Sequence, residues 1–194
     1  MERILVIGCA GAGKSTLARR IAEARGLPLI QLDRAFWRSG WIPTPDEDWR
    51  ALLHQISAGP RWVMDGNYSG SLSIRLPRAD TVIWLDYPRH VCLRRVLART
   101  ARNAGRVRDG LPEGCPERLN VEFLRWIWNF NAKHRPRLIA AFEEFGAHAA
   151  VRRLKSDRDA EQLLAELPAH DDAVPVSASP PPLPTPRSAP PSHG

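Results

Sequence analysis

Nine residues near the front of the chain, GCAGAGKST at positions 8–16, constrain the fold more than any other stretch. They follow an apolar run at residues 4–7 and precede a helical pattern at about 14–24. Gly8, Gly13, Lys14 and Ser15 satisfy the pattern G-x-x-x-x-G-K-[ST] between a strand and a helix. The glycines permit a tight loop whose backbone N–H groups point inward, and the positive end of the following helix attracts anions. The stretch therefore predicts a loop that cradles nucleotide phosphates.

Each residue type in this loop has an expected role. Lys14 reaches the β- and γ-phosphates, and the hydroxyl of Ser15 ligates Mg²⁺. A glycine-rich turn with an exposed lysine is the alternative, but it does not account for the complete pattern in its strand and helix context. We expect ATP to be bound by Gly8, Cys9, Ala10, Gly11, Ala12, Gly13, Lys14, Ser15 and Thr16.

Strand and helix patterns alternate along the chain. The stretches 46–57 and 116–131 repeat apolar residues at helical spacing, so each has one apolar face. Alternation of this kind predicts an α/β fold in which a five-stranded parallel sheet is covered by helices on both faces. The expected strands are 3–7, 28–32, 61–65, 80–86 and 149–154.

The chain changes character near its C-terminal end. Residues 169–194 are rich in Pro, Ser and Ala and contain eight of the 18 prolines, so they cannot bury enough surface to offset the entropy of ordering. We expect one domain at 1–168 and a disordered tail at 169–194. No apolar run approaches the ~20 residues that span a bilayer, and no signal peptide is evident. Three scattered cysteines without a CxxC pair fit a reducing cytoplasm.

Positive charge is concentrated after the fourth expected strand. The formal charge is +7, and six arginines lie between 94 and 108. Arg95, Arg99 and Arg102 are spaced at i, i+4 and i+7, which places them on one face of a helix. Such a cluster can clamp a transferring phosphoryl group, whereas the alternative is a solvated arginine face. We predict that Arg95 and Arg99 have this catalytic role.

A glycine-rich loop at about 103–116 follows that helix and carries Arg106 and Arg108. A basic loop that closes over the site excludes water, which competes with the acceptor, so we expect a lid here. Arg135 and Arg137 are further candidates for contacting the transferring phosphoryl group, and the sequence is equally compatible with a structural role for them.

Acidic residues follow three of the expected strands. Asp65 ends the strand in WVMDGNY, and Asp86 ends the strand in VIWLD; either can hold Mg²⁺ through its water shell or simply cap the next element. Asp33 follows the second strand, where ligands of open α/β sheets bind, and it can bind or deprotonate an acceptor hydroxyl. Phe36, Trp37 and Trp41 either pack in the core or stack on a planar ring.

Several classes of nucleotide-binding protein do not fit the chain. The N-K-x-D stretch of GTP switches and the L-S-G-G-Q signature of transporter ATPases are absent from the sequence. The length is too small for the second core of a helicase motor, and no helix-turn-helix or zinc-finger pattern is present. A small kinase remains as the leading interpretation.

Taken in order, several motifs resemble the bacterial family of DNA topology modulation proteins, a branch of the adenylate-kinase-like P-loop kinases. The resemblance covers about residues 3–165, and its elements are GCAGAGKST, LDRAFWRSGW, WVMDGNY, ADTVIWLDYPR, LRRVLAR and EGCPE followed by FLRWIWNF. It implies a three-layer fold like that of nucleoside-monophosphate kinases, with a basic lid. It also implies that Asp65, rather than Asp86, is the acid linked to Mg²⁺, that Arg95 and Arg99 are the arginine pair beside the lid, and that the protein has a link to DNA supercoiling.

The sequence departs from adenylate kinases on the acceptor side. Their Phe-Pro-Arg after Asp-Gly is Asn67-Tyr68-Ser69 here, and Asp33 with Phe36 and Trp37 replaces their Thr-Gly element. These departures weaken the case for adenosine monophosphate as the acceptor. An acid after the second strand is closer to shikimate-kinase-like enzymes.

We therefore expect a cytoplasmic kinase that transfers the γ-phosphoryl group of Mg²⁺-ATP to a small acceptor, with a nucleotide or nucleoside favoured over a hydroxylated metabolite. Lys14, Arg95, Arg99 and Asp33 are the expected catalytic residues, and Ser15 and Asp65 the expected metal-linked ones. The base is expected near residues 155–157 and the lid helix. The alternatives are an ATP-gated DNA-binding regulator and an ATP-binding protein with only residual hydrolysis.

Overall fold

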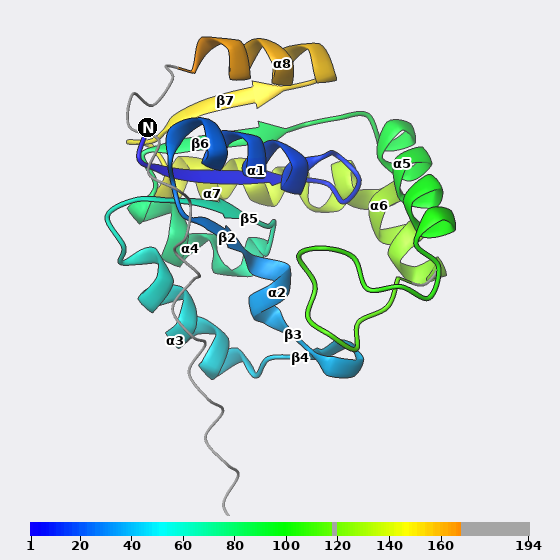
Figure 1. Cartoon of the computed structure of the whole chain (residues 1–194). Coiled ribbons are helices and arrows are strands. Elements are labelled where there is room, and N and C mark those ends of the chain that lie inside the picture. Colours follow the sequence, from blue (N-terminus) through cyan, green and yellow to red (C-terminus); the bar gives the residue numbers. More distant parts are fainter. Residues whose placement is uncertain (118–119, 168–194) are drawn as a thin grey trace, which may run out of the picture.

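The computed structural model describes residues 1–117 and 120–167. A parallel sheet runs through this part of the chain in the order β2-β5-β1-β6-β7 (Figure 1). Its strands are β1 (Arg3–Gly8), β2 (Leu29–Gln31), β5 (Trp62–Asp65), β6 (Thr81–Leu85) and β7 (Ala150–Leu154). A short antiparallel pair, β3 (Trp37–Arg38) and β4 (Ile42–Pro43), stands apart from this sheet.

Helices connect the strands. The α-helices are α1 (Lys14–Arg25), α2 (Leu32–Phe36), α3 (Asp46–Ser57), α4 (Leu72–Arg75), α5 (Arg89–Arg102), α6 (Val121–Lys133), α7 (Arg135–Phe145) and α8 (Asp157–Glu166). Short 3₁₀ turns are η1 (Ser39–Trp41), η2 (Ser69–Ser71) and η3 (Leu76–Arg78).

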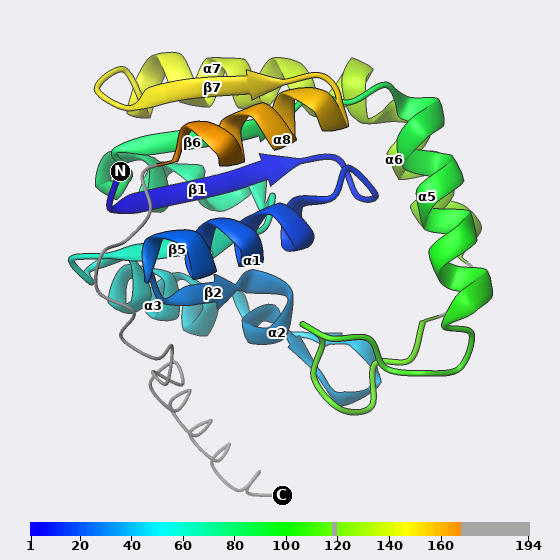
Figure 2. The ribbon, with the colours of Figure 1, turned by 45° about the horizontal axis from the view of Figure 1, so that its top comes forward.

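The sheet is the middle layer of three. Helices α1 and α8 lie on one face, and α3, α4 and α7 lie on the other (Figure 2). Because both faces are covered, the central strand β1 is apolar on both sides, and residues from Ile4 to Ile7 are fully buried. The predicted five-stranded parallel sheet and three-layer fold are confirmed.

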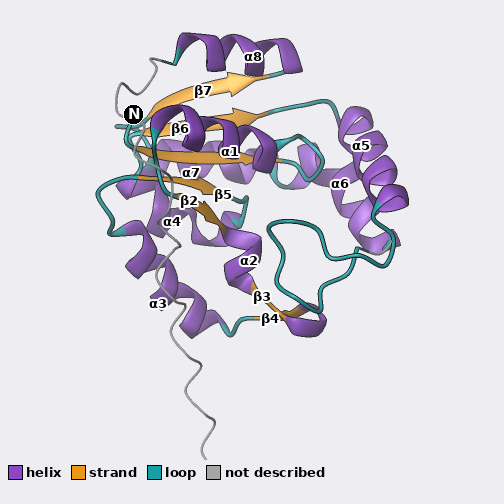
Figure 3. Ribbon diagram, in the orientation of Figure 1, coloured by secondary structure: helices purple, strands orange, loops and turns teal. Residues whose placement is uncertain are grey.

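The carboxyl ends of the strands point toward α5 and α6, which stand at one end of the sheet (Figure 1). Residues 103–117, which follow α5, form a long loop that passes close to α2 and the β3–β4 pair (Figure 3). Parallel strands present their carboxyl ends at one edge, which is where ligands of open α/β sheets bind. The loop therefore lies next to the edge at which chemistry is expected.

Local sequence explains most element boundaries. Helix α3 matches the predicted 46–57 and buries Trp49, Leu52 and Leu53 along one face. The helix predicted at 116–131 instead begins at Val121, because Asn120 accepts hydrogen bonds from the N–H groups of Glu122 and Phe123 and so caps it.

Two expectations concern the ends of the domain and the membrane. The predicted disordered tail at 169–194, together with residue 168, lies outside the described residues. Among the helices that the structure describes, none is long and apolar enough to cross a bilayer.

Candidate active site

The loop after β1 has the backbone shape that its sequence predicts. Gly11 lies at φ +81°, and a Cβ built there would be 2.4 Å from the carbonyl oxygen of Cys92 on α5. Gly13 is also left-handed, at φ 97°, and precedes the first residue of α1, Lys14. The loop is therefore held in a conformation that favours glycine and lies directly at the positive end of a helix.

The Lys14 ammonium group bends back over the loop and donates a 3.0 Å hydrogen bond to the carbonyl of Cys9. The Cys9 side chain is buried beneath the loop, at 3% exposure. The other eight residues of 8–16 line a cavity of about 1080 Å³. Backbone N–H groups, a lysine and a helix end thus converge on one face of a space large enough for a nucleotide.

This cavity also collects the other residues that the sequence nominated, from elements far apart in the chain. Its lining includes Lys14, Ser15, Asp33, Asp65, Arg95 and Arg99. Asp65 is the last residue of β5, Asp33 follows the carboxyl end of the neighbouring strand β2, and the two arginines come from α5. The fold therefore brings together all six of these side chains; their roles remain predictions.

Asp65 is nearly buried, at 6% exposure. Burial raises the pKa of its carboxyl group, while the charge of Lys14 and a hydrogen bond from Ser15 act in the opposite direction. Its Oδ1 atom is buried without a hydrogen-bond partner. A buried, unsatisfied carboxylate oxygen beside a hydroxyl and a phosphate loop fits a Mg²⁺ site.

A metal here would depend on the nucleotide for part of its coordination. Within residues 1–117 and 120–167, no group of three or more His, Cys, Asp and Glu side chains could hold a metal ion. Mg²⁺ commonly takes only one or two protein ligands and completes its shell with phosphate oxygens and water. Ser15 and Asp65 fit that arrangement.

Asp33 is held from two sides. The hydroxyl of Tyr68 donates a 2.8 Å hydrogen bond to its Oδ1, and Arg108 donates a 3.1 Å hydrogen bond to its Oδ2. The carboxylate is still 41% exposed. Burial and the nearby Asp33 carboxylate raise the pKa of Tyr68, so its hydroxyl stays protonated and keeps donating. Asp33 is therefore an oriented, accessible carboxylate.

Arg75 of α4 is a residue of this region that the sequence reasoning missed. It is fully buried and donates to the carbonyls of Gly66, Asn67 and Tyr68. Burial lowers the pKa of its guanidinium to about 9, so the group is still charged at neutral pH. These hydrogen bonds stabilise the loop that follows β5, and Tyr68 is part of that loop. A lone arginine before a proline gives no local signal of this role, because the carbonyls that it binds meet it only in the fold.

Glu117 is the second missed residue. It is 7% exposed and forms ion pairs with Arg99, at 2.8 Å, and with Arg108, at 3.1 Å. Both distances involve Nε atoms that have no aligned hydrogen-bond acceptor, so the attraction is mainly between charges. Burial, followed by the charge of Arg108, lowers the pKa of Arg99. The carboxylate thus neutralises arginines that the sequence assigned to phosphate.

The glycine-rich loop is fastened to the segment after α2. Gly40 donates a backbone hydrogen bond to the carbonyl of Gly114, and the indole of Trp41 donates to the carbonyl of Pro116. Trp41 adopts this position at φ 64°, in the left-handed region. The loop therefore reaches across the cavity mouth from α5 to η1, which suits the predicted lid.

Arg95 lies on the P-loop side of the cavity. It forms a hydrogen-bonded ion pair with Asp157 at the start of α8, and its Nη1 lies 3.5 Å from the carbonyl of Ala12. Tyr87 donates to the other oxygen of Asp157. Asp157 also lines the cavity, within the region where the base was expected.

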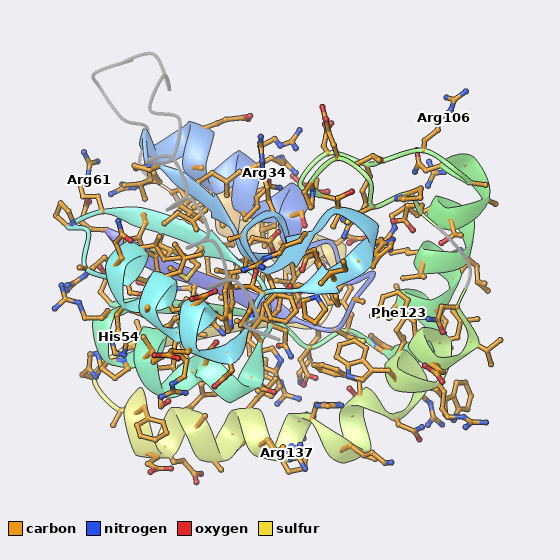
Figure 4. The ribbon with its side chains drawn as sticks, turned by 90° about the horizontal axis from the view of Figure 1, so that it is seen from below. Arg34, His54, Arg61, Arg106, Phe123 and Arg137 are labelled. Atoms are coloured by element: carbon orange, nitrogen blue, oxygen red, sulfur yellow. The ribbon has the colours of Figure 1, made fainter. Side chains whose placement is uncertain are left out.

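Four candidates are not part of the cavity lining. Asp86 forms ion pairs with Arg135 and Arg153, and neither Asp86 nor Arg135 lines the cavity, so a clamp role for Arg135 gains no support and stays a prediction. Arg106 projects outward from the glycine-rich loop, and Arg137 on α7 lies well away from Phe123, a residue of the cavity lining (Figure 4). These arginines were nominated by sequence proximity, which does not fix side-chain direction.

The aromatic residues after β2 divide between two roles. Phe36 packs against Trp49 and Tyr68, with ring centroids 5.1 and 4.8 Å away. Trp37 and Trp41 instead line the cavity, where they are joined by Phe123 and Trp126 of α6. The phosphate loop thus supplies one part of the cavity lining, and these four aromatic side chains supply another, which we call the aromatic end.

Comparisons with known proteins identify a family. Residues 4–111 match the family described as AAA domain. No curated protein matches the chain at a significant level. DNA topology modulation is not shown by these comparisons.

Similar solved structures include a sugar kinase from Janibacter sp. HTCC2649, 20% identical, with 85% of this chain and 91% of that chain covered at a TM-score of 0.48. Shikimate kinase from Bacteroides thetaiotaomicron is 18% identical, and the match covers 84% of this chain and 94% of that chain at a TM-score of 0.48. Shikimate kinase from Acinetobacter baumannii, in complex with shikimate, is 17% identical, and the match covers 85% of this chain and 89% of that chain at a TM-score of 0.47. These likenesses concern the general fold.

Proposed function

The chain belongs to the AAA domain family of P-loop NTPases, and from that premise we propose that it is a kinase. It transfers the γ-phosphoryl group of Mg²⁺-ATP to a hydroxyl group of a small acceptor, in the cytoplasm. The domain that carries this activity is residues 1–168, with the loop at about 103–116 as its lid.

One observation carries the proposal. Asp33 and Lys14 of the phosphate loop line the same cavity, which the four aromatic side chains also line, and the Asp33 side chain is 41% exposed. A site that only hydrolyses ATP needs no second compartment with an oriented carboxylate. Two reactants held in one water-poor space are the main requirement for phosphoryl transfer.

On the ATP side, the chain supplies binding and charge. The loop amides and Lys14 hold the phosphates, and Ser15 and Asp65 hold Mg²⁺, which when bound neutralises phosphate charge. Arg95 lies beside the loop carbonyl of Ala12, so it is placed to contact a phosphate chain bound there. These interactions are strongest when negative charge spreads over the transferring oxygens.

On the acceptor side, Asp33 orients the hydroxyl and accepts its proton. The acceptor oxygen forms a bond to the γ-phosphorus while the bond from that phosphorus to the β–γ bridging oxygen breaks. ADP leaves with that electron pair, and the proton on Asp33 passes to solvent. Arg108 pairs with Asp33 before reaction and, from the lid, is placed to reach the transferring group with Arg99.

Adenosine triphosphate is the preferred donor, with the base near Asp157 and the acceptor among nucleosides, nucleotides and small hydroxylated metabolites. DNA binding remains an alternative that rests only on positive charge and sequence resemblance. It predicts duplex binding with a steep dependence on salt concentration.

The test is ADP release by the purified full chain with Mg²⁺-ATP, with and without nucleosides, nucleoside monophosphates and hydroxy acids. Acceptor-stimulated release in wild type, lost in Lys14→Ala but kept in Lys133→Ala, is the expected result. Lys133 is exposed on α6 and is not part of the cavity lining, so it controls for loss of a surface lysine. Slow turnover that no acceptor changes would reject the proposal and favour residual hydrolysis.

A further inference from the structure

The aromatic end of the cavity suggests what kind of acceptor it takes. Trp37 and Trp41 lie with ring centroids 5.3 Å apart at an angle of 73°, and Phe123 and Trp126 stack 6.0 Å apart at 12°. These two pairs come from segments more than 80 residues apart in the chain, yet both line the one cavity. All four side chains are only partly buried, so each leaves part of its surface for contact with a ligand. Aromatic side chains bind planar rings by stacking.

The charges at this end are balanced internally. Arg108 contacts both Asp33 and Glu117, and Arg99 contacts Glu117. Two guanidinium groups therefore face two carboxylates, and Glu117 is too buried to be screened by water. A phosphate or carboxylate on the acceptor would compete for these two arginines both with Glu117, whose burial makes the loss of a partner unfavourable, and with the transferring phosphoryl group that the proposed function assigns to them. Anionic acceptors also meet repulsion from Asp33.

The other arginines of this region have contacts of their own. Arg95 pairs with Asp157 on the ATP side, and Arg75 is committed to backbone carbonyls. Arg102 also lines the cavity, and it donates its Nε–H to the carbonyl of Ala98 on its own helix. It lies on α5 with Arg95 and Arg99, the helix that the proposed function assigns to the transferring phosphate.

Neutral hydrogen-bonding groups are available instead. The Oδ1 of Asn67 and the Nδ1 of His134 are buried without a hydrogen-bond partner, and both residues line the cavity. Burial, together with the charges of Arg137 and Lys133, lowers the pKa of His134, which favours its uncharged form. Such atoms gain a partner when a ligand brings hydroxyl or N–H groups to them.

We propose that the acceptor is an uncharged, ring-bearing alcohol, of which a nucleoside is the type, and not a phosphorylated or carboxylated molecule. The inference rests on the proposed function and narrows it. The ring stacks on the aromatic end, and a hydroxyl group faces Asp33.

The first experiment compares matched acceptors with the full chain and saturating Mg²⁺-ATP. The probes are the common nucleosides, each beside its 3′-monophosphate and its 5′-monophosphate, so that one charged counterpart keeps whichever hydroxyl group reacts, and benzyl alcohol beside 4-(hydroxymethyl)benzoate. Phosphorylated product is measured by mass spectrometry and ADP by a coupled assay. At least one neutral member should have a kcat/KM at least about 10-fold above its charged counterpart, the scale of one lost charge interaction.

The outcomes separate this inference from the proposed function. A charged member that equals or exceeds its neutral counterpart rejects the inference but supports a kinase. Turnover that no probe stimulates rejects both.

Variants test the two structural arguments separately. Trp126→Leu should raise the KM for the neutral acceptor about 10-fold and leave the KM for ATP unchanged, because one stacking surface is lost. Trp128→Leu is the control: it lies on the same helix but is 49% exposed, beneath Arg89 and outside the lining. If the Trp126 variant fails to fold, Trp41→Leu makes the same test. An unchanged acceptor KM would overturn the stacking argument.

Glu117→Gln should narrow the preference for a nucleoside over its monophosphate, because it releases Arg99 and Arg108 from their buried partner. Glu113→Gln, on the exposed part of the same loop, should leave the preference as in wild type. A preference in Glu117→Gln that equals the wild-type value would overturn the charge argument.

Discussion

The hydroxyl of Tyr68 donates a 2.8 Å hydrogen bond to Asp33, although the two residues are 35 positions apart and on different strand connections. Tyr68 makes this contact from an unusual backbone conformation, at φ 32°. Non-glycine residues in the left-handed region are uncommon and are retained where surrounding contacts hold them. Arg75, which binds the Tyr68 carbonyl, supplies such a contact. Tyr68 is therefore a positioning residue for the carboxylate that we place beside the acceptor.

Replacing Tyr68 with Phe should lower kcat/KM for the acceptor by about 10- to 100-fold. The reason is that hydrogen bonds to charged groups are worth about 1.5–3 kcal/mol. Steady-state kinetics with varied acceptor and with varied ATP measure this change and show whether the KM for ATP is unaffected.

Tyr87→Phe is the matched control, since the Tyr87 hydroxyl donates to Asp157 on the ATP side. It should alter the KM for ATP more than that for the acceptor. Equal effects of the two variants on the acceptor would contradict a specific role for Tyr68.

Gly11→Ala should abolish ATP binding. The added Cβ would lie 2.4 Å from the Cys92 carbonyl and 2.9 Å from a Val96 methyl group, and Gly11 is at φ +81°. The loop has to shift, which misaligns its N–H groups. Binding of a fluorescent ATP analogue checks this, with Gly70→Ala for comparison, because no atom lies within 4 Å of a Cβ added at Gly70. Wild-type affinity in Gly11→Ala would show that the loop does not contact the nucleotide.

Asp65→Asn should stabilise the protein at neutral pH and should weaken the stabilisation that added Mg²⁺-ATP gives. Burial raises the pKa of Asp65 above its usual 3.8, so the folded state holds this proton to a higher pH than the unfolded state does. The free energy of unfolding therefore falls as pH rises from about 3.8 through the raised pKa, and the ionised carboxylate destabilises the fold at pH 7. Asparagine has no such penalty.

Thermal unfolding at pH 7 should show a higher Tm for Asp65→Asn, by about 2–4 °C for each kcal/mol gained. The difference should shrink as the pH is lowered toward 3.8. Added Mg²⁺-ATP should raise the Tm of wild type more than that of the variant. A Tm difference that grows in acid would refute the assigned direction of the pKa shift.

Arg75→Met should destabilise the protein by about 3–5 kcal/mol, because it removes the donor from the carbonyls of Gly66 and Asn67 and one of the donors from the carbonyl of Tyr68, which keeps its hydrogen bonds from Ser71. The Tm should fall by about 10 °C. Arg78→Met, three residues away and exposed, should change it far less. Calorimetry compares the two, and equal losses would mean that Arg75 has no special bracing role.

Sequence periodicity was sufficient for the sheet and most of its helices. Strands that are buried on both faces must be apolar throughout, and the helices that cover them must have one apolar face, so local patterns carry the architecture. The boundaries of α3 follow from such a pattern. The start of α6 was missed because Asn120, a capping residue, outweighed the apolar spacing before it.

The phosphate loop was also determined locally, because Gly11, Gly13, Lys14 and Ser15 act through one turn of backbone and one helix end. Asp33 and Asp65 were nominated because residues at the ends of parallel strands share an edge, and Arg95 and Arg99 because of their helical spacing and the resemblance to adenylate kinases. Only tertiary structure decided their partners: Asp33 with Tyr68, Arg99 with Glu117, and Asp86 with Arg135 and Arg153. Electrostatic and hydrogen-bond partners depend on distances of a few ångströms between distant segments, and no local pattern encodes those distances.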